Sequence, residues 1–166
     1  MLKSIKYLQK SNYYKLYGWV VLLDHVHLLL EIISKKNISQ VMHDLKSYTA
    51  NQISKNITKS RGAEASATRE INNNIDPVAQ ASLPEQKIFK IWQTSFYDHI
   101  IRDERDFYTH LNYIHYNPIK LGYVKRMSEY KYSSYHHFLK KYDKEWLISI
   151  FRDCPVANIN IKENIF

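Results

Sequence analysis

Apolar residues recur along the chain with two different spacings, and each spacing predicts one kind of element. In residues 2–14 they fall at helical intervals with lysines between them, which predicts a helix that is broken at Gly18. Residues 17–33 are almost continuously apolar and rich in β-branched side chains. This pattern predicts two buried strands with a tight turn near Asp24, or one long strand.

The chain then passes from a clearly helical pattern to one without apolar periodicity. Residues 37–54 carry an apolar stripe at helical spacing, and Asn37 can cap this helix with Gln40 as its capping-box partner. Residues 56–86 are small, polar and aperiodic, which predicts a long flexible loop or insertion. We expect no catalytic residue in that segment.

Strand and helix signals return in the second half of the chain. Residues 88–102 have strand character, which is strongest at Phe96–Ile101. Asp103 can cap a helix that runs to about Tyr116, and Pro118 ends it because proline disfavours helical geometry in the residue before it. The core stripe of this helix consists of Phe107, Leu111 and Ile114.

The order of these elements indicates the fold class. Gly122 suits a turn, and the aromatic and basic residues 123–150 predict a short helix or an arm. A strand placed before the first helix would complete a βαββαβ order. We therefore expect an α+β, ferredoxin-like antiparallel sheet with helices on one face, whose first strand is missing and leaves an unpaired edge. Residues 1–150 would form a single domain with 56–86 as its insertion, and 151–166 a C-terminal tail.

Composition narrows the class of partner. Lys and Arg number 24 against 16 Asp and Glu, so the net charge of +8 favours a polyanion such as nucleic acid or an anionic membrane. The 14 tyrosines suit stacking on unpaired bases, although tyrosine is also common in half-buried strands. No apolar run is long enough to span a membrane. Because Cys154 is the only cysteine, no internal disulfide can form, and we expect a cytoplasmic protein.

Two histidines separated by one residue are the first candidates for chemistry. Side chains two apart in a strand point to the same face, so His25 and His27 can reach one metal ion. Two ordinary histidines in a packed sheet would give the same pattern. Burying both on an apolar strand without partners would be costly, however, which favours a ligand.

The helix that follows Asp103 supplies the second group of candidates. Tyr113 and Asn117 are four residues apart and therefore lie on one helix face, and Asp106 and His110 extend that stripe. Tyr113 could instead be a packing residue at the edge of the core. Asn117 could cap a new helix that has a proline at its first position.

These segments together resemble a known family. Residues 24–30, DHVHLLL, resemble the His-hydrophobic-His (HUH) motif of single-tyrosine transposases. WQTSFYDHIIRDERDF at 92–107 and LNYIHYNPIKLGYV at 111–124 resemble the REP-associated tyrosine transposase branch, and LKSYTANQI at 45–53 resembles its second helix. The matching stretches run from about residue 17 to 55 and from 88 to 135. The motifs are specific as a set, whereas His-hydrophobic-His alone is not.

The resemblance implies a role for each matching residue. His25, His27 and the amide oxygen of Asn117 would bind Mg²⁺ or Mn²⁺. Tyr113 would be the nucleophile and would form a 5′-phosphotyrosine with single-stranded or hairpin DNA. Tyr116 is the competing nucleophile, disfavoured because it lies on another helix face than Asn117. Candidates for DNA contact are Lys46, Asn51, His99, Arg102, Lys120, Lys125 and Arg126.

Three functions follow as alternatives. The first is an active DNA transposase and endonuclease, acting as a monomer or a homodimer. The second is a truncated or domesticated relative that binds hairpin or single-stranded DNA without cutting it. The third is a zinc hydrolase that uses His25 and His27 but lacks a clear third ligand, since Asp24 is expected to point away from the histidines.

Overall fold

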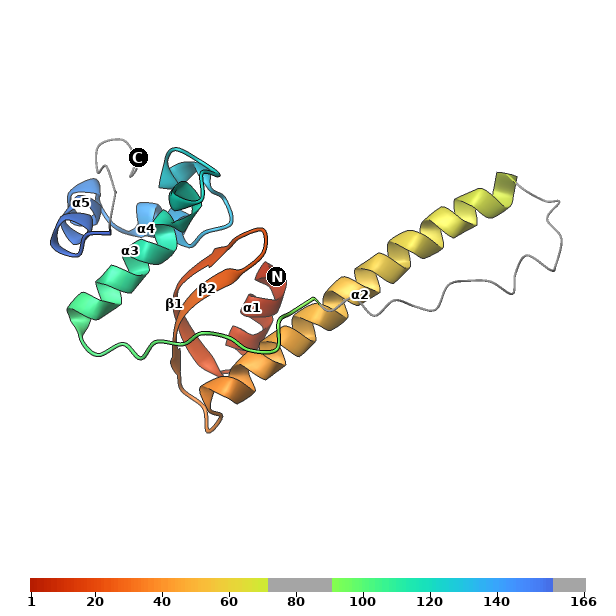
Figure 1. Ribbon diagram of the computed structural model, residues 1–166, viewed down its shortest axis with the longest axis horizontal. Coiled ribbons are helices and arrows are strands. Elements are labelled where there is room, and N and C mark those ends of the chain that lie inside the picture. Colours follow the sequence, from red (N-terminus) through yellow and green to blue (C-terminus); the bar gives the residue numbers. More distant parts are fainter. Residues whose placement is uncertain (72–90, 157–166) are drawn as a thin grey trace. The chain divides into compact units, whose positions relative to one another are not determined.

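The computed structural model describes residues 1–71 and 91–156 (Figure 1). The chain divides into two compact units, the first made of Met1–Ile38 and the chain from Asp98 onward, the second of Ser39–Tyr97. Among the described residues, none of the helices has the length and apolar character that a membrane span requires.

The first unit is built on a β-hairpin, which confirms the α+β class and the turn near Asp24. β1 (Tyr14–Val21) pairs antiparallel with β2 (Val26–Ile32). The backbone N–H of Leu22 closes the turn by donating to the carbonyl oxygen of His25 at 2.9 Å. His25 therefore precedes β2 and belongs to the turn rather than to the strand.

The first helix is shorter than predicted. α1 spans Leu2–Lys10 and not residues 2–14. Asn12 has a φ of +54°, which a right-handed helix excludes and which asparagine tolerates better than most residues. Gly18 does not break the helix, because it lies inside β1.

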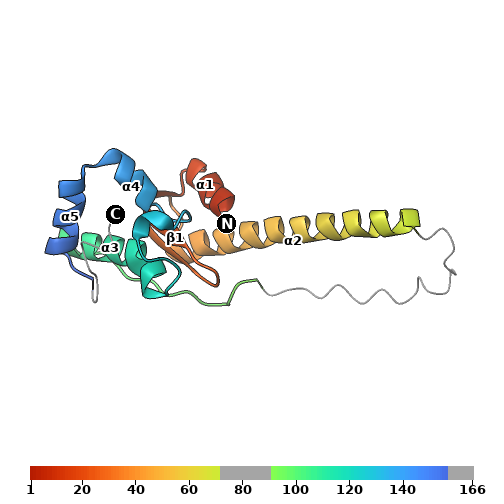
Figure 2. The same ribbon diagram turned by 90° about the horizontal axis from the view of Figure 1, so that it is seen from above.

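One extra residue in β1 determines which side chains face which helix. Leu16 pairs with Leu30 and Gly18 pairs with Leu29, so Tyr17 is a bulge without a partner in β2. Tyr14 and Gly18 consequently lie on opposite faces of the hairpin. The Tyr14 hydroxyl donates to the carbonyl oxygen of Ile5 in α1 at 2.9 Å. The face of Gly18 contacts α3 (Glu104–Lys120), so α1 and α3 lie on opposite sides of the hairpin (Figures 1 and 2).

Gly18 allows α3 to approach the hairpin closely. A Cβ atom at Gly18 would lie 2.6 Å from Cδ1 of Leu111, a distance that carbon atoms do not reach without rearrangement. The interface is a buried apolar cluster made of Val20, Leu22, Leu29, Leu111 and Ile114, with Phe107 packed at its edge. The predicted core stripe of the third helix is thereby confirmed.

The start of α3 agrees with the sequence, and its end does not. Asp103 caps the helix, since its carboxylate accepts from the backbone N–H of Asp106 at 2.8 Å. The helix was expected to end at Pro118 but continues to Lys120. Pro118 lies in the last turn, where helical φ suits the proline ring and the cost is mainly one missing N–H bond. Asn117 is therefore inside α3, and its interpretation as the cap of a new helix is wrong.

Residues beyond α3 complete a second core of the same unit. Gly122, with a φ of +72°, forms the predicted turn. Next come the short 3₁₀ helix η2 (Met127–Glu129), α4 (Tyr135–Lys141) and α5 (Lys144–Asp153). Their buried cluster consists of Tyr116, Met127, Tyr135, Leu147, Ile150 and Phe151. The expected boundary between residues 150 and 151 falls within α5.

The second edge of β1 is covered in part, although the sequence suggested an unpaired edge. Ser133 forms an isolated antiparallel bridge with Val20. The N–H of Val21 donates to the carbonyl oxygen of Tyr132, and the N–H of Ser134 donates to that of Trp19, each at 2.9 Å. The residues before α4 thus satisfy backbone groups on the edge of β1 that does not pair with β2.

His115 is a fully buried histidine beside this edge. Its Nε2 lies 2.8 Å from the Ser134 hydroxyl oxygen, and its ring contacts those of Tyr135 and Phe138. Burial lowers the pKa of His115 to about 3. The folded protein therefore holds this imidazole neutral.

Acid is expected to destabilise the protein through His115. The unfolded chain binds a proton at about pH 6.5, whereas the folded chain binds it only near pH 3, so stability falls as the pH decreases between these values. The slope from one such group approaches about 1.4 kcal/mol per pH unit. Denaturant unfolding at several pH values should give a flatter profile for His115→Gln and an unchanged one for the exposed control His137→Gln. Equal slopes for His115→Gln and the unmodified chain would contradict this account.

The second unit contains a longer helix and less strand than predicted. α2 spans Ile38–Ile71 and is continuous in Figure 2, so the predicted loop is wrong for residues 56–71. That stretch lacks apolar periodicity, but it is rich in Ala, Glu, Lys and Arg and contains no proline, so its intrinsic helix propensity is high. Residues 72–86 of the predicted loop lie outside the described residues.

The strand predicted at Phe96–Ile101 is not formed. Residues 91–103 have irregular backbone, while 88–90 lie outside the described residues. A strand requires a neighbour for its backbone hydrogen bonds, and Tyr97 and Ile100 are instead 100% and 79% exposed. Within the second unit, the Lys46 ammonium donates to the carbonyl oxygens of Gln93 and Ser95 at 3.0 and 2.8 Å and so fastens the segment to α2.

Candidate active site

The two motif histidines lie side by side on the hairpin. His27 pairs with Val20, on the face of the hairpin that contacts α3, and His25 precedes β2 in the turn. Their ring centroids are 4.9 Å apart with planes at 85°. The sequence expectation that both imidazoles face the same side agrees with this geometry.

Asp24 contacts His25, contrary to the expectation that it points away. Its Oδ1 lies 2.6 Å from Nδ1 of His25, and this hydrogen bond holds the pKa of the Asp24 carboxyl below its ordinary value. The sequence argument applied strand alternation to a residue that lies in the turn. A carboxylate on one ring nitrogen is the usual means of orienting a histidine whose other nitrogen binds a metal.

His27 has a buried nitrogen without a partner. Among the described residues, nothing accepts from or donates to its Nε2. Burial is the main cause that lowers the pKa of His27 to about 4, followed by the electrostatic influence of the neighbouring His25 and Lys120. The ring is thus neutral at pH 7, and a lone pair is available to a cation. A buried polar atom normally has a hydrogen-bond partner, so a buried Nε2 without one fits the role of a metal ligand.

Tyr113 packs directly against His27. Their ring centroids are 5.6 Å apart at an interplanar angle of 82°. The Lys120 ammonium lies 3.4 Å from the Tyr113 hydroxyl oxygen and 5.0 Å from the centre of its ring. A positive charge at this position can attract a phosphate to the hydroxyl. The hydroxyl, the lysine and the two histidines therefore form one site.

The environment of Tyr116 differs from that of Tyr113. Tyr116 is 5% exposed and belongs to the buried cluster of Met127 and Phe151. Tyr113 is half-buried and faces the histidines. The contacts thus favour Tyr113 as the residue that meets an external phosphate.

Asn117 lies one helical turn after Tyr113. It is 3% exposed, and its amide nitrogen has no hydrogen-bond partner among the described residues. In that part of the chain four buried side-chain atoms lack a partner, and two of them belong to His27 and Asn117. Nε2 of His27 offers a lone pair to a cation, whereas the amide nitrogen of Asn117 is a hydrogen-bond donor, and the atom of this side chain that can bind a metal is its amide oxygen.

A cavity of about 730 Å³ opens beside the nucleophile candidate. Its lining includes His110, Tyr113, Tyr116 and Lys120 from α3, and Val156 after α5. Aromatic rings and one ammonium group in a cavity of this size suit an unpaired nucleotide.

The other predicted DNA contacts are scattered and partly engaged. Lys46 and Asn51 belong to the second unit, where the ammonium of Lys46 contacts two backbone carbonyls. In the first unit Arg126 pairs with Glu129 at 2.9 Å, and the backbone N–H of Lys125 donates to the same carboxylate. Of all the predicted contacts, Lys120 is the one that directly touches Tyr113.

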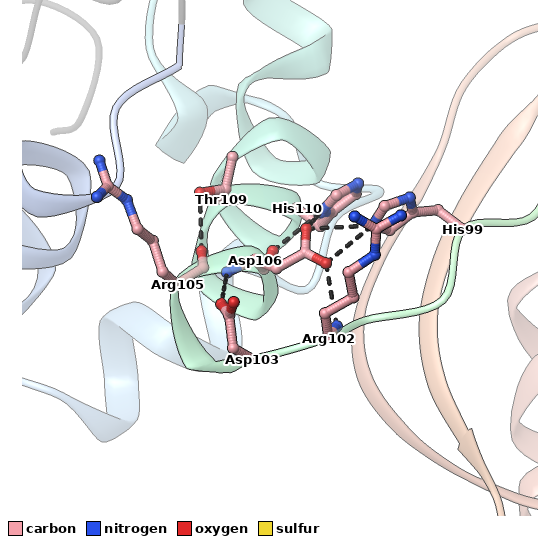
Figure 3. A network of polar contacts seen from close by, with 7 residues as sticks. All are labelled: His99, Arg102, Asp103, Arg105, Asp106, Thr109 and His110. Atoms are coloured by element: carbon pink, nitrogen blue, oxygen red, sulfur yellow. Dashed lines mark hydrogen bonds and ion pairs between the residues drawn. The ribbon is translucent and has the colours of Figure 1, made fainter.

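The sequence argument gave no chemical role to a cluster at the start of α3. His99, Asp106 and His110 bring three ligand atoms within 4.8 Å of one another (Figure 3). Asp106 and His110 had been placed on the stripe of Tyr113, and His99 among the DNA contacts. The spacing of four between Asp106 and His110 was the available signal, but the fold was needed to bring His99 to them.

Comparison with known proteins finds similarity to one family of transposases. The family described as "Transposase IS200 like" matches residues 1–68. A putative REP-associated tyrosine transposase of Haemophilus influenzae is 30% identical over 128 residues, which cover 76% of this chain and 62% of that protein. These matches show that the chain is similar to the REP-associated tyrosine transposases. Another such transposase, from Escherichia coli, is 38% identical over 58 residues, or 34% of this chain and 35% of that protein.

A solved structure has the same fold. It is the structure of a REP-associated tyrosine transposase bound to a REP hairpin, with a TM-score of 0.54 and 23% identity. The match covers 84% of this chain and 66% of that one. The family resemblance predicted from the motifs is thus confirmed. The chain nevertheless spans only about 62% of the length of the Haemophilus influenzae transposase.

Proposed function

We propose that this relative of the REP-associated tyrosine transposases cuts and rejoins single-stranded DNA through a covalent 5′-phosphotyrosine on Tyr113. His25, His27 and Asn117 would hold Mg²⁺ or Mn²⁺. The main support is the contact between the Tyr113 ring and His27, whose buried Nε2 lacks a partner. The proposed nucleophile is thus adjacent to a nitrogen that can bind a metal ion.

The donor set fits a divalent cation that activates phosphate. Two neutral imidazoles and an amide oxygen leave the ion its full charge and leave positions open for phosphate oxygens. When bound, the ion would polarise the scissile phosphate and stabilise its developing charge. Asp24 would orient His25 through the 2.6 Å contact with its Nδ1.

The residues themselves account for the covalent step. The Tyr113 oxygen attacks the phosphorus, the bond from phosphorus to the 3′ oxygen breaks, and a 3′-hydroxyl leaves. The phenol loses its proton and the leaving oxygen takes one up, so the exchange is balanced and the ester is conserved for rejoining. Lys120, 3.4 Å from the hydroxyl, would bring a positive charge to the phosphate that the hydroxyl attacks. Phenol needs this help because its ordinary pKa is about 10.

A single-stranded or hairpin DNA is the substrate that the surroundings favour. The cavity beside Tyr113 has room for an unpaired nucleotide, and the chain carries a net charge of +8. The related transposase of known structure was solved with a REP hairpin. A base outside a duplex can also stack on tyrosine, which a paired base cannot do.

A non-catalytic DNA-binding protein is the second candidate. The observation in its favour is that the chain spans 62% of the length of the Haemophilus influenzae relative. This alternative predicts hairpin binding without cleavage under every metal condition.

One experiment distinguishes the two candidates. The full chain is incubated with labelled hairpin DNA from its own flanking sequence, with Mg²⁺, Mn²⁺ or EDTA, and analysed by denaturing gel and mass spectrometry. A metal-dependent adduct on the peptide that contains Tyr113 supports the proposed enzyme. Binding without an adduct selects the non-catalytic protein, whereas cleavage that requires zinc and produces no adduct selects a hydrolase.

Lys120→Gln is expected to slow adduct formation on the order of a hundredfold, as the loss of one charge-stabilising donor does in other enzymes. The replacement removes the positive charge next to the Tyr113 hydroxyl and keeps a polar side chain. Single-turnover rates at saturating DNA measure the effect. Lys125→Gln removes one charge without touching Tyr113 and should retain most of the rate, so an equal loss in both variants would point to general DNA attraction.

A further inference from the structure

Three potential metal ligands meet away from the hairpin histidines. Asp106 lies on the first turn of α3, and its carboxylate contacts Nε2 of His99 at 2.9 and 3.1 Å. Nδ1 of His110, one turn later, is 2.9 Å from the same carboxylate. The two rings are stacked, with centroids 4.2 Å apart and planes at 16° (Figure 3). Both imidazole nitrogens therefore converge on one carboxylate.

We propose that His99, Asp106 and His110 bind a transition-metal ion of the zinc class. The site would be separate from the Mg²⁺ or Mn²⁺ site proposed at His25 and His27, and it does not depend on that proposal. Two imidazole nitrogens and a carboxylate oxygen are donors that zinc accepts, while Mg²⁺ prefers oxygen ligands.

The distances are close to those of a coordinated ion. Two ligands bound at about 2.0–2.1 Å in tetrahedral geometry lie about 3.4 Å apart. The nitrogens of His99 and His110 are each 2.9 Å from an oxygen of Asp106, and all three donors lie within 4.8 Å of one another. A shift of a few tenths of an ångström at each side chain would therefore admit the ion. Metal binding would displace the proton between His99 and the carboxylate, and also any proton on Nδ1 of His110, which lies 2.9 Å from both the carboxylate and the backbone carbonyl oxygen of Asp106.

The surroundings fix the carboxylate and leave the ion accessible. The backbone N–H of Arg102 donates to Oδ2 of Asp106 at 3.1 Å, which holds that oxygen in place as an outer-shell donor does. Exposed fractions are 43% for the His99 side chain, 20% for Asp106 and 36% for His110. Water could thus supply the fourth ligand, and the ion could enter from solvent.

An ion at this site would hold two parts of the chain together. His99 belongs to the irregular segment before α3, while Asp106 and His110 belong to the helix that carries Tyr113. An ion shared by them would fasten this segment to the first two turns of α3. His110 also lines the cavity beside Tyr113, so the ion would fix one wall of the proposed nucleotide pocket.

Titration of the full chain with Co²⁺ and Zn²⁺ tests the proposal. Tetrahedral Co²⁺ has visible absorption, and Zn²⁺ affinity is measured by calorimetry. We expect His99→Gln and His110→Gln each to weaken Zn²⁺ binding at this site by at least about tenfold. The matched control His43→Gln removes a histidine that pairs with Asp44 and belongs to no cluster of three metal ligands among the described residues, so it should leave binding unchanged.

A second variant separates this site from the proposed catalytic one. His27→Gln should abolish the metal-dependent DNA adduct and leave the Zn²⁺ site of His99 and His110 intact. Failure of the adduct experiment alone would overturn the proposed function and not the zinc site. Zn²⁺ binding that is lost in His27→Gln but kept in His99→Gln and His110→Gln would overturn the zinc proposal. Absence of Zn²⁺ binding to the unmodified chain would do the same.

Discussion

Tyr113→Phe abolishes the covalent DNA adduct, by at least about a thousandfold, and leaves hairpin binding within about twofold, if Tyr113 is the nucleophile. The substitution removes one hydroxyl and keeps the ring that packs against His27 at 5.6 Å. The hydroxyl contacts the exposed Lys120, and loss of this exposed contact should leave folding unaffected. Adduct formation is measured by mass spectrometry, and binding by fluorescence anisotropy.

Tyr116→Phe is the matched control for this prediction. Tyr116 lies three residues further along the same helix, in the buried cluster with Met127 and Phe151. Loss of its hydroxyl can affect stability but should leave the adduct intact. If the adduct survives in Tyr113→Phe and disappears in a folded Tyr116→Phe, the nucleophile is Tyr116 and the assignment to Tyr113 is wrong.

His27→Ala is expected to have the second-largest effect, a loss of Mg²⁺- or Mn²⁺-dependent adduct formation. The loss should exceed the approximately 10- to 100-fold change that follows when a residue that only orients a ligand is replaced. The reason is that His27 offers a neutral, buried nitrogen without another partner. Adduct yield is measured as a function of metal concentration, because partial loss of a ligand raises the concentration required.

The two possible defects of His27→Ala can be separated. Removal of a half-buried ring beside Tyr113 could loosen α3, so thermal unfolding is measured in parallel, and His27→Gln provides a polar replacement with less change in volume. Full activity of a folded His27→Ala, or activity of the unmodified chain in EDTA, would remove the metal from the proposed mechanism. His43→Gln, an exposed substitution in the second unit, should match the unmodified chain in both measurements.

The parts of the fold that the sequence predicted correctly depend on local interactions. Asp103 was recognised as a cap because its side chain bonds a backbone N–H three residues later. The hairpin and the Leu111 and Ile114 stripe followed from apolar spacing. Each of these signals is complete within a few residues of the chain.

The elements that the sequence predicted wrongly depend on interactions with distant residues, or on unfavourable local energies that the fold tolerates. Strand character at Phe96–Ile101 was a true local preference, but no neighbouring strand satisfies it among the described residues. α2 continues beyond residue 54 on helix propensity rather than on amphipathic pattern. Pro118 is accepted inside α3 because it lies near the end, where little of the helix remains to be disturbed.

In the candidate site, too, local spacing predicted some features, while others depend on contacts between distant residues. Spacing alone placed His25 with His27, and Tyr113 with Asn117, but it could not bring the two pairs together. That contact requires α3 to pack on the hairpin face of Gly18, where a side chain would meet Leu111. The contact of Asp24 with His25, and that of His99 with Asp106, arise from irregular backbone, for which periodicity makes no prediction.

The bulge at Tyr17 has a consequence for how the length of this chain can vary. Leu16 already faces Leu30 and Gly18 already faces Leu29, so a chain that lacked Tyr17 would have an uninterrupted ladder with every remaining side chain on its present face. It would lose the Tyr17 hydrogen bond to Glu31 and an edge contact with Phe107. Loss of Val20 would instead exchange the two faces on one side of the gap. Homologous chains one residue shorter at the bulge can therefore keep the same histidine geometry, and an alignment gap at this point carries no information about activity.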